Sequence, residues 1–217
     1  YTTLFRSPHG VVGGIGLGNG VQYAKNATTF MPSYVPTLFV VTQDIRATKD
    51  GQQVLVIDNA GSNAVLYSAD AGAAFEEKKI TSALPKQALA RYGALVDAKT
   101  WFVTLGNWPE KKQSTASVHY QSARVFSMKT ADGKVKRVSE KMMSRVLKNG
   151  TADGYSAAVA KTTDGGATWT TVFSAESNFY FNAIDCTSAT HCVAVGEGFN
   201  QGAGAHIYQT TDGQTFT

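Results

Sequence analysis

One short pattern recurs along this chain: an apolar segment, a tight polar turn and a closing aromatic residue. The clearest copies are 156–169 (SAAVAKTTDGGATW) and 64–75 (AVLYSADAGAAF), with a shorter one at 205–216 (AHIYQTTDGQTF) and a fainter one at 21–30 (VQYAKNATTF). A unit of this size cannot bury its apolar face alone, so repeats of it must stack on one another. The repeat therefore predicts a row of similar β units that share a continuous core.

The spacing of the closing aromatics gives the size of the unit. Phe30 and Phe75 lie 45 residues apart, Phe75 and Trp169 lie 94 apart, and Trp169 and Phe216 lie 47 apart. A period of about 46, with an insertion of similar length in one unit, fits a four-stranded propeller blade. We predict an all-β fold of about four antiparallel blades, at 1–33, 34–80, 88–175 with an insertion at 109–155, and 176–217.

Apolar runs supply the remaining strands of each blade. The predicted inner strands are 2–6, 37–44, 92–97 and 181–186, and the predicted second strands are 10–16, 54–58, 101–106 and 192–196. Nearly continuous apolar runs are expected where neighbouring blades cover both faces of a strand. The insertion contains a further possible hairpin, 123–128 with 135–139. A long insertion in a compact blade is usually functional or disordered.

The turn has the form Ser/Thr-x-Asp-x-Gly-x-x-Trp/Phe, complete at 68–75 and 162–169, one residue short at 210–216, and without its Asp and Gly at 23–30. In this motif and in blade length the chain resembles the Asp-box, or BNR-repeat, propellers, which include sialidases and sortilin-type receptors. Complete members usually have more blades than this chain. The resemblance therefore implies that the chain is part of a larger propeller, or that another chain completes it.

The motif has a local physical logic. The Asp carboxylate accepts backbone N–H groups inside the turn, Gly adopts a backbone conformation that other residues resist, and the aromatic fills the gap between neighbouring sheets. The residues given this structural role are Asp70, Gly72, Phe75, Asp164, Gly166, Trp169, Asp212 and Phe216. The resemblance places these turns on the lower outer rim, away from the ligand face. One carboxylate per blade does not make a calcium site, and we predict neither a metal nor a cofactor.

The two cysteines, Cys186 and Cys192, lie six residues apart. A disulfide between the arms of a hairpin is favoured, because a metal site would need more ligands than the nearby His191 and the spacing is not that of a C-x-x-C redox site. A disulfide implies an oxidising compartment. Sequons at Asn26 and Asn149 agree with a secreted or extracellular glycoprotein. No apolar stretch reaches the ~18 residues of a membrane helix.

The net charge of +4 raises the question of anionic partners. The densest group of basic residues lies at 129–148 and contains no aromatic residue. Binding of nucleic acid would need stacking aromatics interleaved with the basic residues, so it is not expected. A solvated face is the simpler interpretation of this segment.

The resemblance implies that ligands meet the upper face, formed by the loops between strands two and three and between blades. The candidate binding residues on those loops are Arg91, Trp108, Phe179, Tyr180, Glu197 and Phe199. Asp44 and Arg46, at the end of an inner strand, approach the central channel. An ordinary packing or loop role competes with the binding role for each of these residues.

Two functions are compatible with these features. The first is a secreted, non-enzymatic binding or scaffold module that recognises a protein or glycan, since loop aromatics suit a lectin and the basic insertion suits an acidic partner. The alternative is a sialidase-like glycoside hydrolase or a fragment of one. That activity implies an arginine triad, a Tyr–Glu pair and an Asp acid. The segment 5–8 (FRSP) only partly matches the sialidase Phe/Tyr-Arg-Ile-Pro motif, and the sequence shows no clear Tyr–Glu pair, so we assign no catalytic residue.

Overall fold

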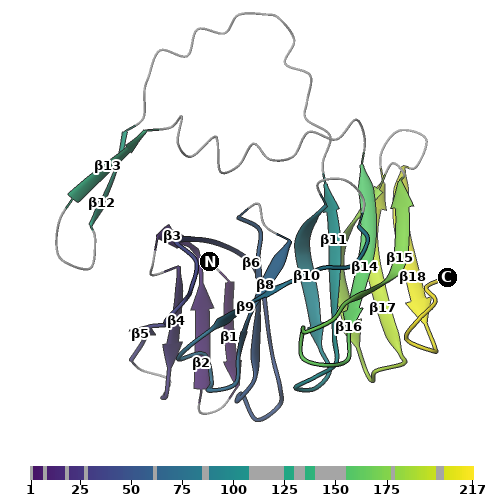
Figure 1. Ribbon diagram of the computed structural model, residues 1–217, viewed down its shortest axis with the longest axis horizontal. Coiled ribbons are helices and arrows are strands. Elements are labelled where there is room, and N and C mark those ends of the chain that lie inside the picture. Colours follow the sequence, from purple (N-terminus) through teal and green to yellow (C-terminus); the bar gives the residue numbers. More distant parts are fainter. Residues whose placement is uncertain are drawn as a thin grey trace, which may run out of the picture.

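The computed structural model describes residues 2–6, 9–17, 20–26, 29–60, 63–84, 88–107, 125–129, 135–139, 155–176, 179–198 and 203–217. Every regular element in these ranges is a β-strand, and every strand pair is antiparallel. Four sheets of three to five strands follow one another in chain order, from the first sheet at one end to the fourth at the other (Figure 1). The all-β prediction is confirmed.

The strands of the four sheets are as follows. The first sheet contains β1 (Thr2–Arg6), β2 (His9–Gly13), β4 (Val21–Ala24) and β5 (Met31–Pro32). The second contains β3 (Ile15–Leu17), β6 (Phe39–Ala47), β7 (Val54–Asp58), β8 (Ala64–Ser68) and β9 (Glu76–Lys79). The third contains β10 (Leu89–Leu95), β11 (Trp101–Asn107), β14 (Ser156–Thr162) and β15 (Thr170–Glu176). The fourth contains β16 (Phe179–Cys186), β17 (Cys192–Gly198) and β18 (Gly204–Thr210).

The insertion holds the separate hairpin β12 (Val125–Lys129) and β13 (Val135–Ser139), with Val125 opposite Ser139. The predicted extra hairpin is thus present. One predicted strand is wrong: 10–16 is not a single strand. The chain breaks at Gly14, whose N–H donates to the carbonyl of Gly20, and β3 then crosses to pair with β6 of the second sheet. This crossing ties the first two sheets together through the backbone.

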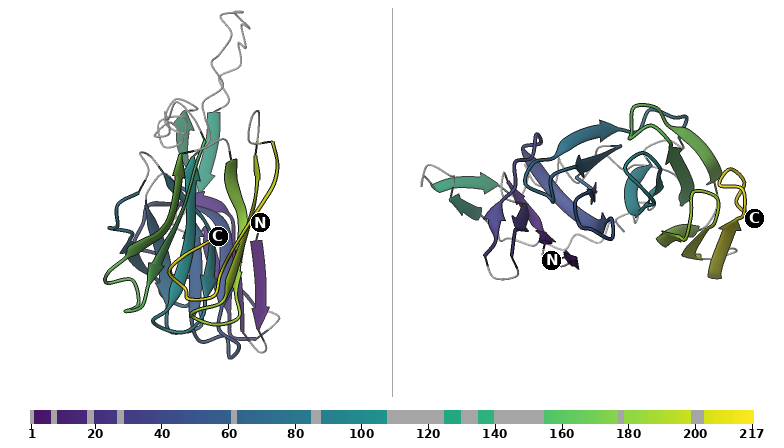
Figure 2. Two further views of the ribbon diagram at one scale, coloured as in Figure 1. Left: turned by 90° about the vertical axis from the view of Figure 1, so that its right-hand side faces the viewer. Right: turned by 90° about the horizontal axis from the view of Figure 1, so that it is seen from below.

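The core consists of three apolar seams between consecutive sheets. Val11 and Val21 of the first sheet pack with Val54 and Val56 of the second. The second seam contains Leu55, Ile57 and Val65 against Trp101, Val103 and Leu105. The third contains Phe102 and Val159 against Phe181, Ile184 and Ala194. The view from below in Figure 2 shows the same row of sheets, with the first and fourth at its two ends.

The repeated turns hold themselves together by the same hydrogen bonds. In 68–75 the Ser68 hydroxyl donates to Asp70 Oδ1 at 2.6 Å and accepts the Gly72 N–H at 2.9 Å, while Asp70 Oδ1 accepts the Ala74 N–H at 3.0 Å. Thr162 and Asp164 repeat this pattern, with Gly166 N–H and Thr168 N–H both at 2.9 Å from their acceptors. In the shorter turn the Asp212 carboxylate instead accepts from Gln214 and Thr215.

The glycine of each turn also lies against the preceding sheet. Gly72 has φ 89°, and a Cβ there would lie 2.7 Å from Val11 Cγ2 of the first sheet. Gly166 has φ 83°, and a Cβ there would lie 3.0 Å from Lys78 Cβ of the second sheet and 2.9 Å from Trp101 of its own sheet. Conformation and space thus both require glycine, which explains why the turn recurs at the seams.

The faint copy of the turn, which lacks the aspartate, uses a substitute for it. The register that places Gly10 opposite Ala24 puts Ala24 where the other sheets have Ser68 and Thr162. Asn26 then falls at the position of the turn aspartate, and its Oδ1 accepts the Thr29 N–H at 3.1 Å. An amide oxygen therefore performs the carboxylate's role.

We predict an acid-sensitive contribution from these turns. Hydrogen bonds from Thr168 and then Thr162 lower the pKa of Asp164 to about 2, and those from Thr215, Gln214 and Thr210 lower the pKa of Asp212 to about 2. Since the pKa of an unfolded Asp is ~3.9, this stabilisation is complete above that pH and is lost as the pH falls toward 2. In thermal melts from pH 6 to pH 2, the double variant Asp164→Asn, Asp212→Asn should therefore be less stable than wild type at pH 6 and converge with it near pH 2. Asp185→Asn, at an exposed carboxylate outside the turns, is the control; a constant gap between double variant and wild type would contradict the prediction.

Candidate functional site

A polar and aromatic cluster lies at the upper face, defined here as the end of the sheets where β11 ends at Asn107 and β14 begins at Ser156 (Figure 1). At the same end of the fourth sheet, β16 begins and β17 ends, with Phe179 opposite Gly198. Tyr180 and Glu197 are directly opposite one another across these two strands. The register of the hairpin thus brings together two residues that are 17 apart in sequence.

Tyr180 and Glu197 form a hydrogen bond in which the phenol donates to Glu197 Oε1. Tyr180 is only 6% exposed, whereas Glu197 is exposed. Burial, with a further contribution from the bond to Glu197, raises the pKa of Tyr180 to about 12. Hydrogen bonds from Tyr180 and then Asn182 lower the pKa of Glu197. At neutral pH the pair is therefore a neutral phenol holding an exposed carboxylate in a fixed position.

Arg91 and Tyr155 enclose the Tyr180 ring. The Arg91 guanidinium carbon lies 5.0 Å from the centroid of the Tyr180 ring and 5.9 Å from that of Tyr92, within the range of a cation–π contact. Arg91 is 7% exposed, and burial lowers its pKa from the usual value. It nevertheless stays charged, because a guanidinium is not deprotonated in proteins. Tyr155 stacks on Tyr180 with the ring centroids 5.8 Å apart.

A layer of packed aromatics supports this cluster. Phe179 is 2% exposed, and its ring stacks on His206 with the centroids 4.3 Å apart. It also contacts Tyr208, Phe181 and Phe173. Phe179 thus lies in the seam between the third and fourth sheets, where it positions the neighbouring Tyr180.

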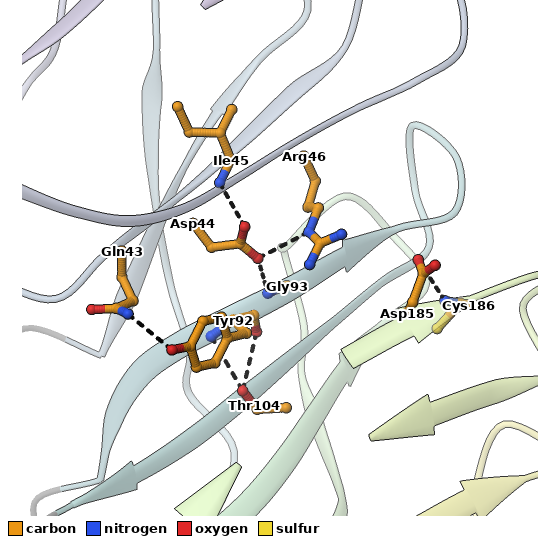
Figure 3. A network of polar contacts seen from close by, with 9 residues as sticks. All are labelled: Gln43, Asp44, Ile45, Arg46, Tyr92, Gly93, Thr104, Asp185 and Cys186. Atoms are coloured by element: carbon orange, nitrogen blue, oxygen red, sulfur yellow. Dashed lines mark hydrogen bonds and ion pairs between the residues drawn. The ribbon is translucent and has the colours of Figure 1, made fainter. Parts of the chain in front are cut away.

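A second polar network joins the inner strands β6 and β10 (Figure 3). Asp44 Oδ2 accepts from Arg46 Nε at 2.9 Å and from the Gly93 N–H at 3.0 Å. Gln43 Nε2 donates to the Tyr92 hydroxyl at 3.1 Å, and the Tyr92 N–H donates to Thr104 Oγ1 at 3.2 Å. The Gly93–Asp44 and Gln43–Tyr92 bonds connect the second and third sheets, and the bond from Arg46 holds the Asp44 carboxylate in place.

The structure brings three of the candidate residues, Arg91, Tyr180 and Glu197, into one cluster, with Phe179 below it. Trp108 and Phe199 lie outside the described residues. Sequence reasoning missed Tyr155 and the Tyr180–Glu197 pair. The pair depends on a bulge between Phe181 and Ala183 that shifts the register, and sequence spacing does not reveal it. Tyr155 could have been noticed, since it directly precedes the strand that returns from the insertion.

Other predicted features are reported for the described part of the chain. Cys186 and Cys192 form a disulfide across β16 and β17, the pairing that the sequence predicts. Within the residues placed by the structure, no three His, Cys, Asp or Glu side chains gather where they could hold a metal ion. That same part contains no helix long and apolar enough to cross a membrane.

No protein-family model and no curated protein matches the sequence. Among solved structures, a GH74 xyloglucanase from Xanthomonas campestris superposes with a TM-score of 0.54 at 9% identity, over 98% of this chain and 28% of its own length. The four sheets are blades of a β-propeller. At this identity the likeness establishes the fold alone.

Two further solved structures show weaker similarity to this chain. A structure of YCF48 bound to D1 peptide matches 95% of this chain and 75% of its own at 15% identity, with a TM-score of 0.31. The Trypanosoma rangeli sialidase, in complex with a difluorinated keto-deoxy-nononic acid, matches 96% of this chain and 41% of its own at 14% identity, also with a TM-score of 0.31. The first to fourth sheets are blades 1 to 4.

Proposed function

We propose that this chain is a secreted, non-enzymatic propeller module that binds a protein or glycan ligand at its upper face. The observation that carries the proposal is the exposed Glu197 carboxylate, held by buried Tyr180 beside buried Arg91. Burying a guanidinium costs desolvation energy, and such perturbed groups concentrate at functional sites. A fixed carboxylate with aromatic neighbours is suited to accept hydroxyl or ammonium donors from a ligand.

A glycan fits this arrangement by two kinds of contact. Sugar hydroxyls would donate to Glu197, and an apolar sugar face would pack on the half-buried Tyr155. A protein ligand would instead place a Lys, Arg or hydroxyl side chain on the same carboxylate. The two ligand classes share the Glu197 contact and differ in what the aromatic neighbour meets.

A binding assay tests the site. We expect the chain to retain members of a glycan array, and Glu197→Gln to weaken the best ligand by about tenfold or more, because a hydrogen bond to a charged group contributes ~1.5–3 kcal/mol. Asp185→Asn, an exposed carboxylate at the other end of β16, is the matched control and should bind as wild type. Equal binding by wild type and Glu197→Gln would remove the site from the proposal. If the chain retains no glycan, pull-down of a protein ligand in a Glu197-dependent manner would support the protein-binding form of the proposal.

The Tyr180–Glu197 pair also supports the alternative function, a glycosidase, since a sialidase-like mechanism uses a Tyr–Glu pair near arginines. Two facts favour binding over catalysis: Tyr180 is 6% exposed, and its pKa is raised to about 12, which makes the phenol harder to ionise as a nucleophile. If the chain hydrolyses aryl sialosides or other aryl glycosides and Tyr180→Phe abolishes this activity, the protein is a glycosidase and the binding proposal is wrong. Arg6→Ala tests the partial motif in the same assay.

The proposal includes secretion, glycosylation and completion of the propeller. The disulfide is compatible with an oxidising compartment. Asn26 is exposed in the repeated turn of blade 1, and Asn149 lies outside the described residues. A glycan on Asn26 would stand at the opposite end of the blades from Glu197 and leave the upper face clear. We further propose that the four blades form part of a larger propeller or are completed by another chain, and that nucleic acid is not a partner.

A further inference from the structure

A β-bulge recurs in the inner strands of blades 2, 3 and 4. In each of β6, β10 and β16 the register skips one residue where the strand pairs with the second strand of its blade. The skipped residues are Gln43, Arg91 and Asn182, and all three have polar side chains. A bulge turns a side chain out of the regular alternation of a strand, and bulges are frequent beside active sites.

The three bulges occupy equivalent positions. Val54, Trp101 and Cys192 each pair with the hydroxyl residue of the repeated turn, which aligns the second strands of the three blades. Three residues further along, each second strand pairs with the residue that follows the bulge. These second-strand residues are Ile57, Thr104 and Val195. The bulge therefore repeats with the blade, and its polar side chains form a row that crosses three blades.

Contacts between neighbouring blades make this row continuous. Gln43 Nε2 of blade 2 donates to the Tyr92 hydroxyl of blade 3 at 3.1 Å (Figure 3). The Arg91 guanidinium of blade 3 lies over the Tyr180 ring of blade 4, 5.0 Å from its centroid. Asn182 hydrogen-bonds to the carboxylate that Tyr180 holds. The polar network of Figure 3 and the Tyr180 cluster are thus parts of one row.

The row keeps hydrogen-bonding groups that a ligand can use. The Tyr92 hydroxyl oxygen accepts hydrogen bonds from Gln43 and Arg91, so its own proton remains to be donated. Gln43 Oε1 accepts no hydrogen bond from the described residues. Gln43, Tyr92 and Asn182 are half-buried, so each is held by its surroundings and still within reach of solvent. Amide, phenol and carboxylate groups in sequence suit the many hydroxyl groups of a sugar chain.

We propose that this bulge row, formed by Gln43, Tyr92, Arg91, Asn182 and Glu197, binds an uncharged oligosaccharide whose successive sugars lie along blades 2 to 4. The inference rests on the proposed ligand site at Glu197 and extends it, since it names the ligand class and adds Gln43 and Tyr92 as specificity-determining residues. Packed sheets lie roughly 10 Å apart, so a row that crosses three blades is wider than one sugar ring.

The charges of the row favour an uncharged sugar chain. Glu197 is exposed, and the hydrogen bond from Tyr180 lowers the pKa of its carboxyl, so it is anionic at neutral pH and repels an acidic sugar. Arg91 is 7% exposed, with its guanidinium over the Tyr180 ring, so it presents little surface to a sugar carboxylate. A protein ligand would need a pocket for an apolar anchor, whereas the row consists of amide, phenol and charged groups.

Binding of oligosaccharides of increasing length tests this inference. The probes are linear gluco-, manno-, galacto- and N-acetylchito-oligosaccharides of one to six units, and the same sugars oxidised to uronic acids. We expect the affinity for the bound series, measured by isothermal titration calorimetry, to rise by about tenfold or more between one and four units, because further sugars gain hydrogen bonds from further blades. The uronic acid forms should bind about tenfold more weakly than their uncharged counterparts, because like charges then face one another.

Two variants separate the row from the Glu197 site. Gln43→Leu and Tyr92→Phe each remove a hydrogen-bonding group and nearly preserve side-chain size. Each should weaken binding of the four-unit sugar by about three- to tenfold, the effect of one lost hydrogen bond, and leave the shortest sugar that binds unchanged, since that sugar contacts only the Glu197 end. Gln22→Leu and Tyr23→Phe make the same changes at half-buried residues of β4 in blade 1. These matched controls should bind as wild type, and thermal melts verify that all four variants are folded.

An affinity independent of sugar length would overturn the inference, as would wild-type binding of the four-unit sugar by both Gln43→Leu and Tyr92→Phe. Either result, with Glu197→Gln still weakening the ligand, would leave the proposed function intact. Length-dependent binding that Gln43→Leu weakens and Glu197→Gln does not would support the row and contradict the Glu197 site. Preference for the uronic acid forms, or capture of a protein with no sugar bound, would also overturn the inference.

Discussion

Replacing Trp101 by alanine is expected to lower the free energy of unfolding by about 3–5 kcal/mol, the usual cost of truncating a large buried aromatic. Trp101 is 0% exposed in the seam between blades 2 and 3. Its ring stacks on Tyr67 at 4.6 Å and meets Trp169 edge-on at 6.2 Å, and its indole N–H donates to the Asp97 carbonyl at 3.0 Å. The substitution leaves a cavity at the seam and an unpaired carbonyl.

Urea denaturation measures this cost. The transition is monitored by far-ultraviolet circular dichroism, a signal that does not depend on the tryptophan that is removed. Tyr34→Ala removes an aromatic ring of similar size that is 67% exposed, and it should change stability by less than about 0.5 kcal/mol. A Trp101→Ala variant within 1 kcal/mol of wild type would show that the seam repacks around the missing ring. An unchanged m-value is required for the comparison, because it shows that the unfolding transition has kept its character.

The second large effect is expected when a lysine is placed, in separate variants, at equivalent positions of blades 3 and 4. Val159→Lys is expected to prevent folding, because the side chain at 0% exposure would bring an unpaired ammonium into the seam between blades 3 and 4, at a cost of several kcal/mol that is comparable to the whole stability of a domain. Ile207→Lys makes the same change at the equivalent 68% exposed position and should leave a folded chain.

The two variants serve as controls for one another. Val159 and Ile207 occupy the same position in the third strand of their blades, pair with equivalent residues of the second strand, and are both replaced by lysine. Expression in soluble form, the far-ultraviolet circular dichroism spectrum and a cooperative melt distinguish the folded from the unfolded variant. A folded Val159→Lys would mean that blade 4 can separate from blade 3 without loss of the remaining structure. Unfolding by Ile207→Lys would mean that its side chain is buried in the folded chain.

Much of the fold could be predicted because its turns are specified locally. The second strand 54–58 matches β7, and the predicted 101–106 and 192–196 extend by one and two residues to form β11 and β17. Each of these strands begins directly after a polar turn, so its start depends on residues close in sequence. Inner strands were less accurate: 37–44 became β6, which runs to Ala47, because its outer residues are fixed by pairing with β7 and packing on β10.

What the sequence did not reveal depends on contacts between distant residues. The break at Gly14 exists because β3 finds a partner in β6, beyond the first blade. Asn26 could not be equated with a turn aspartate until the pairing of Gly10 with Ala24 fixed the alignment. Arg91, Tyr180 and Glu197 come from three strands in two blades, and only the stacking of those blades brings the guanidinium over the phenol ring. Their binding role stays a prediction.

The pairing of β11 with β14 determines where the chain can be shortened or cut without loss of the blade. Seven consecutive residue pairs, from Trp101 with Thr162 to Asn107 with Ser156, close the base of the insertion like an ordinary hairpin. The entropy of closing a loop rises only with the logarithm of its length, about 0.6 kcal/mol for each doubling. The blade can therefore accept a short linker in place of residues 108–155, or new termini between Asn107 and Ser156, as a circularly permuted or split protein whose halves reassemble along this hairpin.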